Sequence, residues 1–74
     1  MKKRMRLRDL REDNDLTQQQ VADLLGTTKQ YYQKYESGIR PIPVDRLETL
    51  ADFYKTSTDY LLGRTRIKKP YPIE

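Results

Sequence analysis

The sequence predicts an all-α fold, a compact domain of five short helices. Glycine, proline and hydroxyl-bearing capping residues divide the middle of the chain into short segments. Within each segment, apolar residues recur three or four positions apart, as on one face of a helix. No segment alternates apolar and polar residues in the manner of a half-buried strand. The 74 residues suffice for one domain, and with 35% apolar residues its core must be modest.

The first helix is expected from Met5 to Asn14. Leu7 and Leu10 lie three positions apart and supply its apolar side, with charged residues around the rest of the circumference. The helix should end in the turn-prone residues 13–15, which read Asp-Asn-Asp.

The second helix is expected over residues 18–25. Thr17 followed by Gln20 fits a capping box, in which each side chain bonds an otherwise unpaired backbone N–H group. Gly26 ends the helix because glycine adopts the left-handed conformation without steric cost. The apolar stripe should consist of Val21, Leu24 and Leu25.

The third helix is expected over residues 29–37, with Thr28 as its N-cap and Gly38 after its end. Tyr32 and Tyr35 should form its inner face. Its outer face then carries Lys29, Gln30, Gln33 and Lys34. Only about three residues separate this helix from the second, so the two should cross sharply.

Two further helices follow a loop in which Pro41 and Pro43 prevent helix formation. The fourth is expected over residues 44–54, with Pro43 suited to its first turn. The fifth is expected over residues 58–62, between Ser57 and Gly63. The buried face of the fourth should consist of Leu47, Leu50, Ala51 and Tyr54. The expected organisation is a basic arm at residues 1–4, the domain at 5–63 and a basic, proline-containing tail at 64–74.

Charge is distributed unevenly along the chain. Residues 1–8 carry +5, residues 9–63 carry −4 and residues 64–74 carry +3. Basic chain ends are typical of proteins that bind a polyanion such as nucleic acid, although a solvated end that only aids solubility is the plain alternative. An anionic lipid surface is less well matched, since no amphipathic apolar face accompanies the charge. The basic arm residues are Lys2, Lys3, Arg4 and Arg6.

Residues 17–37 have the layout of a helix-turn-helix, with two capped helices joined by a glycine turn. The second of these helices must protrude to enter a major groove, which is about 12 Å wide. Glutamine can pair with adenine there and lysine with guanine. An ordinary solvated face is the alternative, and the capped layout favours DNA over it.

These segments resemble the Cro/CI-type helix-turn-helix family, also called the xenobiotic-response-element type, with its lambda-repressor-like domain. The resemblance lies in TQQQVADLLG at 17–26 and TKQYYQKYESG at 28–38, followed by LA at 50–51 and DYLLG at 59–63. It covers about residues 5–63. Two tyrosines at the inner positions of the third helix depart from the family, which usually has aliphatic residues or tryptophan there.

The resemblance implies an all-α domain that binds operator DNA, usually as a two-fold dimer. The residues expected to contact bases are Lys29, Gln30, Gln33 and Lys34. The residues expected to contact the DNA backbone are Gln18, Thr28, Tyr31 and Arg40. For Tyr31, covering a neighbouring helix is an equally good interpretation. Arg11 and Glu36 occupy the positions of a family ion pair that is structural.

The expected function is sequence-specific binding of double-stranded DNA by a small, repressor-like transcriptional regulator. The alternative is a protein-interaction module on the same fold, such as an antitoxin-like or anti-regulator partner. The chain has no histidine or cysteine, and no nucleophile–base pair is evident, so neither an enzyme, a metal site nor a cofactor is expected. The expected partners are a DNA operator and a second copy of the chain, with no membrane and no small-molecule ligand. The expected location is the cytoplasm, as a bacterial or phage-encoded, nucleoid-associated protein.

Overall fold

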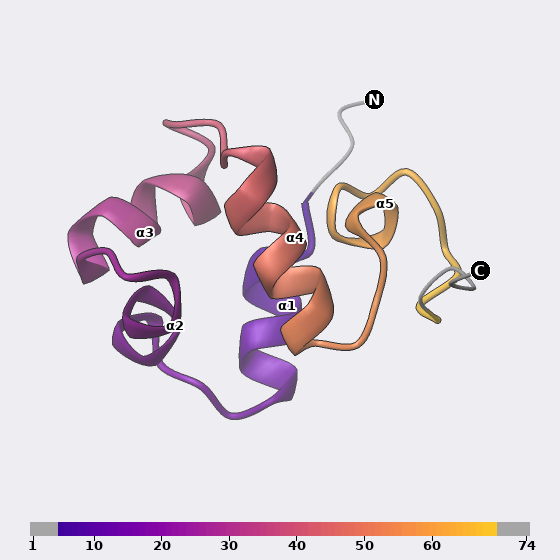
Figure 1. Cartoon of the computed structure of the whole chain (residues 1–74), viewed down its shortest axis with the longest axis horizontal. Coiled ribbons are helices and arrows are strands. Elements are labelled where there is room, and N and C mark those ends of the chain that lie inside the picture. The colour runs from indigo at the N-terminus through magenta and orange to yellow at the C-terminus, as the bar shows by residue number, and fades with distance from the viewer. Residues whose placement is uncertain (1–4, 70–74) are drawn as a thin grey trace. The chain divides into compact units, whose positions relative to one another are not determined.

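The computed structural model describes residues 5–69, which contain five helices and no strand (Figure 1). The predicted all-α class is confirmed for these residues. The helices are α1 (Leu7–Asp13), α2 (Gln18–Leu25), α3 (Lys29–Ser37), α4 (Val44–Phe53) and α5 (Thr58–Leu61). The chain divides into two compact units. One unit runs from Leu7 to Ile42 and holds α1–α3, and the other holds α4, α5 and the residues that flank them, including residues 5–6.

In the first unit, α2 begins and ends where its capping residues predict. The hydroxyl of Thr17 accepts from the backbone N–H of Gln20, and the side chain of Gln20 accepts from the backbone N–H of Thr17, at 3.1 and 2.8 Å. Gly26 has a φ of +69° and donates its N–H to carbonyls of the last turn. Left-handed backbone at this position is what glycine permits without steric cost.

A capping hydroxyl and a left-handed glycine also mark the two ends of α3. The hydroxyl of Thr28 accepts from the backbone N–H of Tyr31 at 3.1 Å, and Gly38 ends the helix with a φ of +81°. Both ends of α3 agree with the sequence-based bounds. Because only residues 26–28 separate α3 from α2, the two helices lie side by side in a sharp turn of the chain (Figure 1).

The buried face of α2 differs from the predicted stripe. Val21 is buried as expected, but Leu24 is 42% exposed and the buried neighbour is Ala22. At 100° per residue, Val21, Ala22 and the half-buried Leu25 form one sector of the helix, whereas Leu24 lies outside it. On α3, Tyr32 and Tyr35 are buried as predicted, with their rings edge to face at 6.3 Å.

Helix α1 is shorter at both ends than its apolar pattern indicates. Leu7 and Leu10 are buried as expected. The side chain of Asn14 donates to the carbonyl of Leu10 at 2.7 Å, and Asp15 then takes a left-handed φ of 56°, which stops the helix. At the other end, the backbone N–H of Arg6 donates to the carbonyl of Leu61, so residues 5–6 belong to the second unit.

In the second unit, the four residues predicted to form the inner face of α4 are all buried: Leu47, Leu50, Ala51 and Tyr54. Pro43 is the N-cap of α4 rather than a residue of its first turn. Ser57 caps α5 by accepting from the backbone N–H of Tyr60 at 3.0 Å. Of the helices between residues 5 and 69, none combines the length and the apolar content that crossing a bilayer requires.

Candidate nucleic-acid interface

The outer face of α3 carries four exposed polar side chains. Lys29, Gln30, Gln33 and Lys34 are all exposed, whereas Tyr32 and Tyr35 on the opposite side are buried. At 100° per residue, the four polar positions cover about 140° of the helix circumference. A continuous sector of amide and ammonium groups therefore faces away from the first unit. These are the groups that can pair with base edges in a major groove.

Tyr31 lies at the border between the two faces of α3. Its side chain is 39% exposed, and its ring meets the ring of Tyr35 edge to face at 5.6 Å. The ammonium group of Lys34 lies 5.6 Å from the centre of the Tyr31 ring, within the range of a cation–π contact. Tyr31 thus covers a neighbouring ring and also limits where the Lys34 side chain lies.

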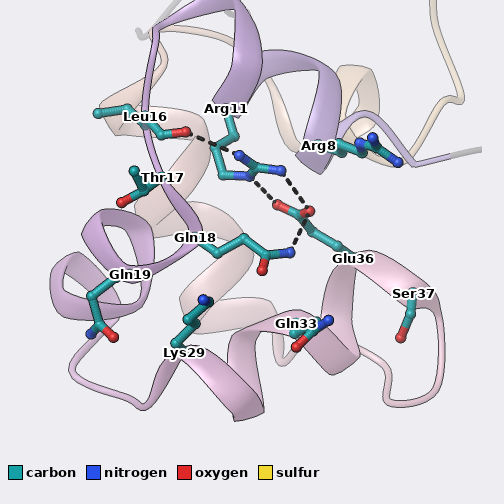
Figure 2. A pocket seen from close by; sticks show the side chains of 10 residues that line it. All are labelled: Arg8, Arg11, Leu16, Thr17, Gln18, Gln19, Lys29, Gln33, Glu36 and Ser37. Atoms are coloured by element: carbon teal, nitrogen blue, oxygen red, sulfur yellow. Dashed lines mark hydrogen bonds and ion pairs between the residues drawn. The ribbon is translucent and has the colours of Figure 1, made fainter.

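A cleft of about 820 Å³ adjoins this face (Figure 2). Helices α1, α2 and α3 all contribute to it, and every lining residue belongs to the first unit. Among the residues predicted from sequence, the cleft brings together Gln18, Lys29, Gln33, Arg11 and Glu36. Thr28, Gln30, Tyr31, Lys34 and Arg40 do not line it.

Arg11 and Glu36, which both line the cleft, form a two-pronged ion pair (Figure 2). Nε of Arg11 donates to Oε2 of Glu36 at 2.6 Å, and Nη2 donates to Oε1 at 3.2 Å. Nη1 of Arg11 donates to the carbonyl of Leu16 at 3.0 Å. The two side chains are only 12% and 6% exposed. One guanidinium group therefore ties α1 to α3 and to the turn that leads into α2.

Burial alone would raise the pKa of Glu36, but donors around its carboxylate reverse the effect. Hydrogen bonds from Arg11, Tyr32 and Gln18 hold the pKa of Glu36 below its ordinary value. The pKa of Arg11 is raised, chiefly by the same hydrogen bond to Glu36. Both groups are consequently charged at neutral pH, and the pair is a fixed element of this surface.

Gln18 is held by the same carboxylate. Its Nε2 donates to Oε1 of Glu36 at 3.1 Å, and the side chain is half-buried. An amide nitrogen has two N–H donors, and Glu36 accepts one of them. The amide therefore has a defined orientation at the first residue of α2.

Arg8 and Ser37 also line the cleft, although the sequence assigns neither to the site. The side chain of Arg8 is 61% exposed and forms an ion pair with Glu12 one turn later, at 3.3 Å. In the sequence, Arg8 belongs to the run of basic residues at 1–8, which suggests an arm. Its position three residues before Arg11 is the signal that would place it on the same face of α1.

The other predicted residues lie apart from the cleft. Arg40 is exposed after α3, where its backbone N–H donates to the carbonyl of Lys34 at 3.2 Å. Thr28 is exposed while its hydroxyl caps α3. Lys2, Lys3 and Arg4 lie outside the described residues.

Arg6 requires a correction to its assignment as an arm residue. Its guanidinium donates to the carbonyls of Tyr60 and Thr65 at 2.6 and 3.0 Å and lies 4.1 Å from the centre of the Tyr60 ring. A carbonyl oxygen has two lone pairs, so that of Tyr60 accepts from this guanidinium as well as from the backbone N–H of Gly63, and Arg6 anchors the second unit.

Comparison with known proteins gives a consistent result. A family model described as helix-turn-helix matches residues 7–61. The HTH-type transcriptional regulator AnsR of Bacillus subtilis (strain 168) is 43% identical over 67 residues, which are 90% of this chain and 58% of that protein. The HTH-type transcriptional regulator ImmR of the same strain is 34% identical over 64 residues, covering 86% of this chain and 50% of ImmR.

A phage protein is also similar. The cryptic phage CTXphi transcriptional repressor RstR of Vibrio cholerae is 41% identical over 49 residues, which are 66% of this chain and 44% of RstR. The chain thus spans about half the length of the curated relatives it matches. No solved structure gives a significant match.

Proposed function

Because this chain belongs to the helix-turn-helix family, as its resemblance to the Cro/CI type predicts, we propose that it binds double-stranded DNA sequence-specifically and regulates transcription. The observation that carries the proposal is the exposed polar sector of α3, on a helix capped at both ends and backed by buried tyrosines. A rigid helix of this kind fits a major groove, in which each base pair presents a distinct pattern of donors and acceptors.

Base recognition is assigned to Lys29, Gln30, Gln33 and Lys34. Gln30 and Gln33 carry amides that can pair with adenine through two hydrogen bonds, and the two lysines can donate to guanine. The contact of Lys34 with the Tyr31 ring supports a role in recognition, because it restricts the ammonium group before DNA arrives.

Backbone contacts are assigned to the cleft and to the residues beside α3. The N–H groups of Gln18 and Gln19 belong to the first turn of α2, where no partner exists within the helix, so they can donate to a phosphate. Arg8 and Lys29 add positive charge to the same cleft. Thr28, Tyr31 and Arg40 supply further contacts to the sugar–phosphate chain.

The regulatory role is proposed to be repression by a homodimer on a two-fold operator. RstR is named a transcriptional repressor, and helix-turn-helix dimers place their reading helices about one DNA turn apart. The proposed DNA target and the bacterial origin of the relatives support a location in the bacterial cytoplasm. The proposed role is binding of DNA and not catalysis. The alternative, a protein-interaction module on the same fold, is not favoured, because the relatives carry the names of transcriptional regulators.

Selection of bound duplexes from a random DNA pool tests the proposal directly. We expect a consensus with two related half-sites whose centres are about 34 Å apart, which is one helical turn. Recovery of a single half-site would contradict the two-fold arrangement. Recovery of no consensus, while one protein is retained stoichiometrically in a pull-down, would contradict DNA recognition and favour the interaction module.

A further inference from the structure

Residues 64–69 form an ordered basic segment of the second unit, here called the basic strap. It contains Arg64, Arg66, Lys68 and Lys69 and no acidic residue. All four cationic side chains are exposed, and so is Ile67. The sequence predicts only that the segment belongs to a basic, proline-containing tail, so the contacts that fix its backbone are informative.

Three hydrogen bonds fasten the strap to the unit that contains it. The backbone N–H of Arg64 donates to the carbonyl of Asp59 at 2.8 Å. Nη1 of Arg6 donates to the carbonyl of Thr65 at 3.0 Å while its guanidinium lies against the Tyr60 ring. The hydroxyl of Thr56, a buried residue, donates to the carbonyl of Lys68. These bonds use the backbone of the strap and leave its charged side chains exposed to solvent.

The strap differs in charge from the unit that contains the helix-turn-helix. The unit that contains α1–α3, residues 7–42, has five basic and six acidic residues, so it is slightly negative as a whole. DNA binding depends strongly on cations that neutralise phosphates and release counterions. The helix-turn-helix unit alone lacks an excess of cations, whereas the strap adds four without an acid between them.

We propose that the basic strap is a second DNA-contacting surface that binds backbone phosphates without regard to sequence. The proposal rests on the DNA-binding function proposed above. Because its backbone is already fastened, the strap loses less conformational freedom on binding than a free tail of the same composition. Because contacts to phosphates carry no sequence information, the contribution of the strap should be equal on all duplexes, in contrast to that of the outer face of α3.

The test is a salt titration of DNA affinity for the variant R64Q/R66Q/K68Q/K69Q, from about 50 to about 200 mM salt. Fluorescence anisotropy would be measured on a selected operator and on an unrelated duplex. For each phosphate that the variant no longer neutralises, the slope of log K against log salt should become shallower by about 0.9. Affinity should fall by the same factor on both duplexes.

Two controls separate charge from packing. The variant R64K/R66K keeps the charges and should keep the slope. Lys55→Gln removes an exposed lysine of the same unit outside the strap and should change the slope less than Lys68→Gln does. The single variants K68Q and K69Q give the same comparison if the fourfold variant is less stable.

An unchanged slope in the fourfold variant would overturn the proposal, and so would a loss confined to the operator. Loss of binding to phosphatidylserine vesicles with unchanged DNA binding would assign the strap to a membrane surface and would equally overturn it. A failure of the proposed function is distinct from these results, because the wild-type chain would then show no preference for any duplex.

Discussion

The side-chain amide of Gln18 and the carboxylate of Glu36 are joined by a hydrogen bond of 3.1 Å that links the start of α2 to the end of α3 (Figure 2). The accepting atom, Oε1, also receives Nη2 of Arg11. One carboxylate therefore fixes a residue proposed to meet a phosphate and the helix proposed to read bases. Changes to this carboxylate or its partners should consequently alter the stability of the unit that presents α3.

The stability contributed by Glu36 should depend on pH. Its pKa in the folded chain is lowered from an ordinary value of 4.5, so its contribution is fully present above that value and is lost as the pH falls through the folded-state pKa. Urea unfolding of wild type and Glu36→Gln should give a difference in unfolding free energy that shrinks between neutral and acidic pH. Glu48→Gln, an exposed carboxylate on α4, is the control. A difference that stays constant with pH would contradict the assignment.

Removing only one partner of the ion pair should be costly. Arg11→Ala leaves the carboxylate of Glu36, 6% exposed, without its main partner, and we expect a loss of about 3–5 kcal/mol in unfolding free energy. The double variant R11M/E36L replaces both charges by apolar groups and should recover much of that loss, because desolvation of the pair offsets most of its attraction. Equal stability of the single and double variants in chemical denaturation would refute this account.

Substitution on the outer face of α3 should alter base preference. Gln30→Ala is expected to cost about 1–3 kcal/mol on the selected operator and much less on unrelated duplexes, with a relaxed consensus at one position. Thermal unfolding should remain close to that of wild type, since Gln30 is exposed. The assignment of α3 is wrong if both Gln30→Ala and Lys34→Ala leave operator affinity unchanged.

Arg8 and Arg40 should contribute equally to all sequences. Arg40→Ala and Arg8→Gln should each weaken binding to every duplex and make the salt slope shallower by about 0.9. Glu12→Gln is the matched control for Arg8, because it breaks the same exposed ion pair while keeping the cation. If the role of Arg8 were to pair with Glu12, both variants would have the same effect on affinity and the proposal for Arg8 would be withdrawn.

Arg6 should contribute chiefly to stability. Arg6→Gln removes two bonds from a charged donor to carbonyls together with a cation–π interaction, and we expect a decrease of about 2 kcal/mol in unfolding free energy. The selected consensus should be unchanged. A variant with wild-type stability but a shallower salt slope would restore the interpretation of Arg6 as a free arm residue.

The elements that could be predicted from sequence are those set by local chemistry. The bounds of α2 and α3 follow from Thr17, Thr28 and the two glycines, each of which acts within one helical turn. The start of α1 could not be predicted, because the backbone of Arg6 bonds a carbonyl more than fifty residues away. The predicted face of α2 is wrong at Leu24, since apolar spacing alone does not show which sector is covered.

In the candidate site, too, features set by local sequence could be predicted and features set by the packing of distant segments could not. Helical periodicity suffices to predict the outer face of α3, because the exposure of these side chains depends only on their direction around the helix axis. Family resemblance supplies the pairing of Arg11 with Glu36, which residue types cannot indicate at that separation. The cleft position of Arg8 and the bond from Gln18 to Glu36 depend on how three helices pack, and no local pattern encodes them.

The ends of α3, set by Thr28 and Gly38, limit how many base pairs one copy of the chain can read. With nine residues, α3 is about 13 Å long, which corresponds to about four base pairs along a duplex. Four base pairs recur by chance roughly once in every 250 positions, whereas a genome offers about a million or more competing sites. A single copy would therefore be bound mostly at chance matches. Recognition of one unique site requires several recognition helices on the same stretch of DNA.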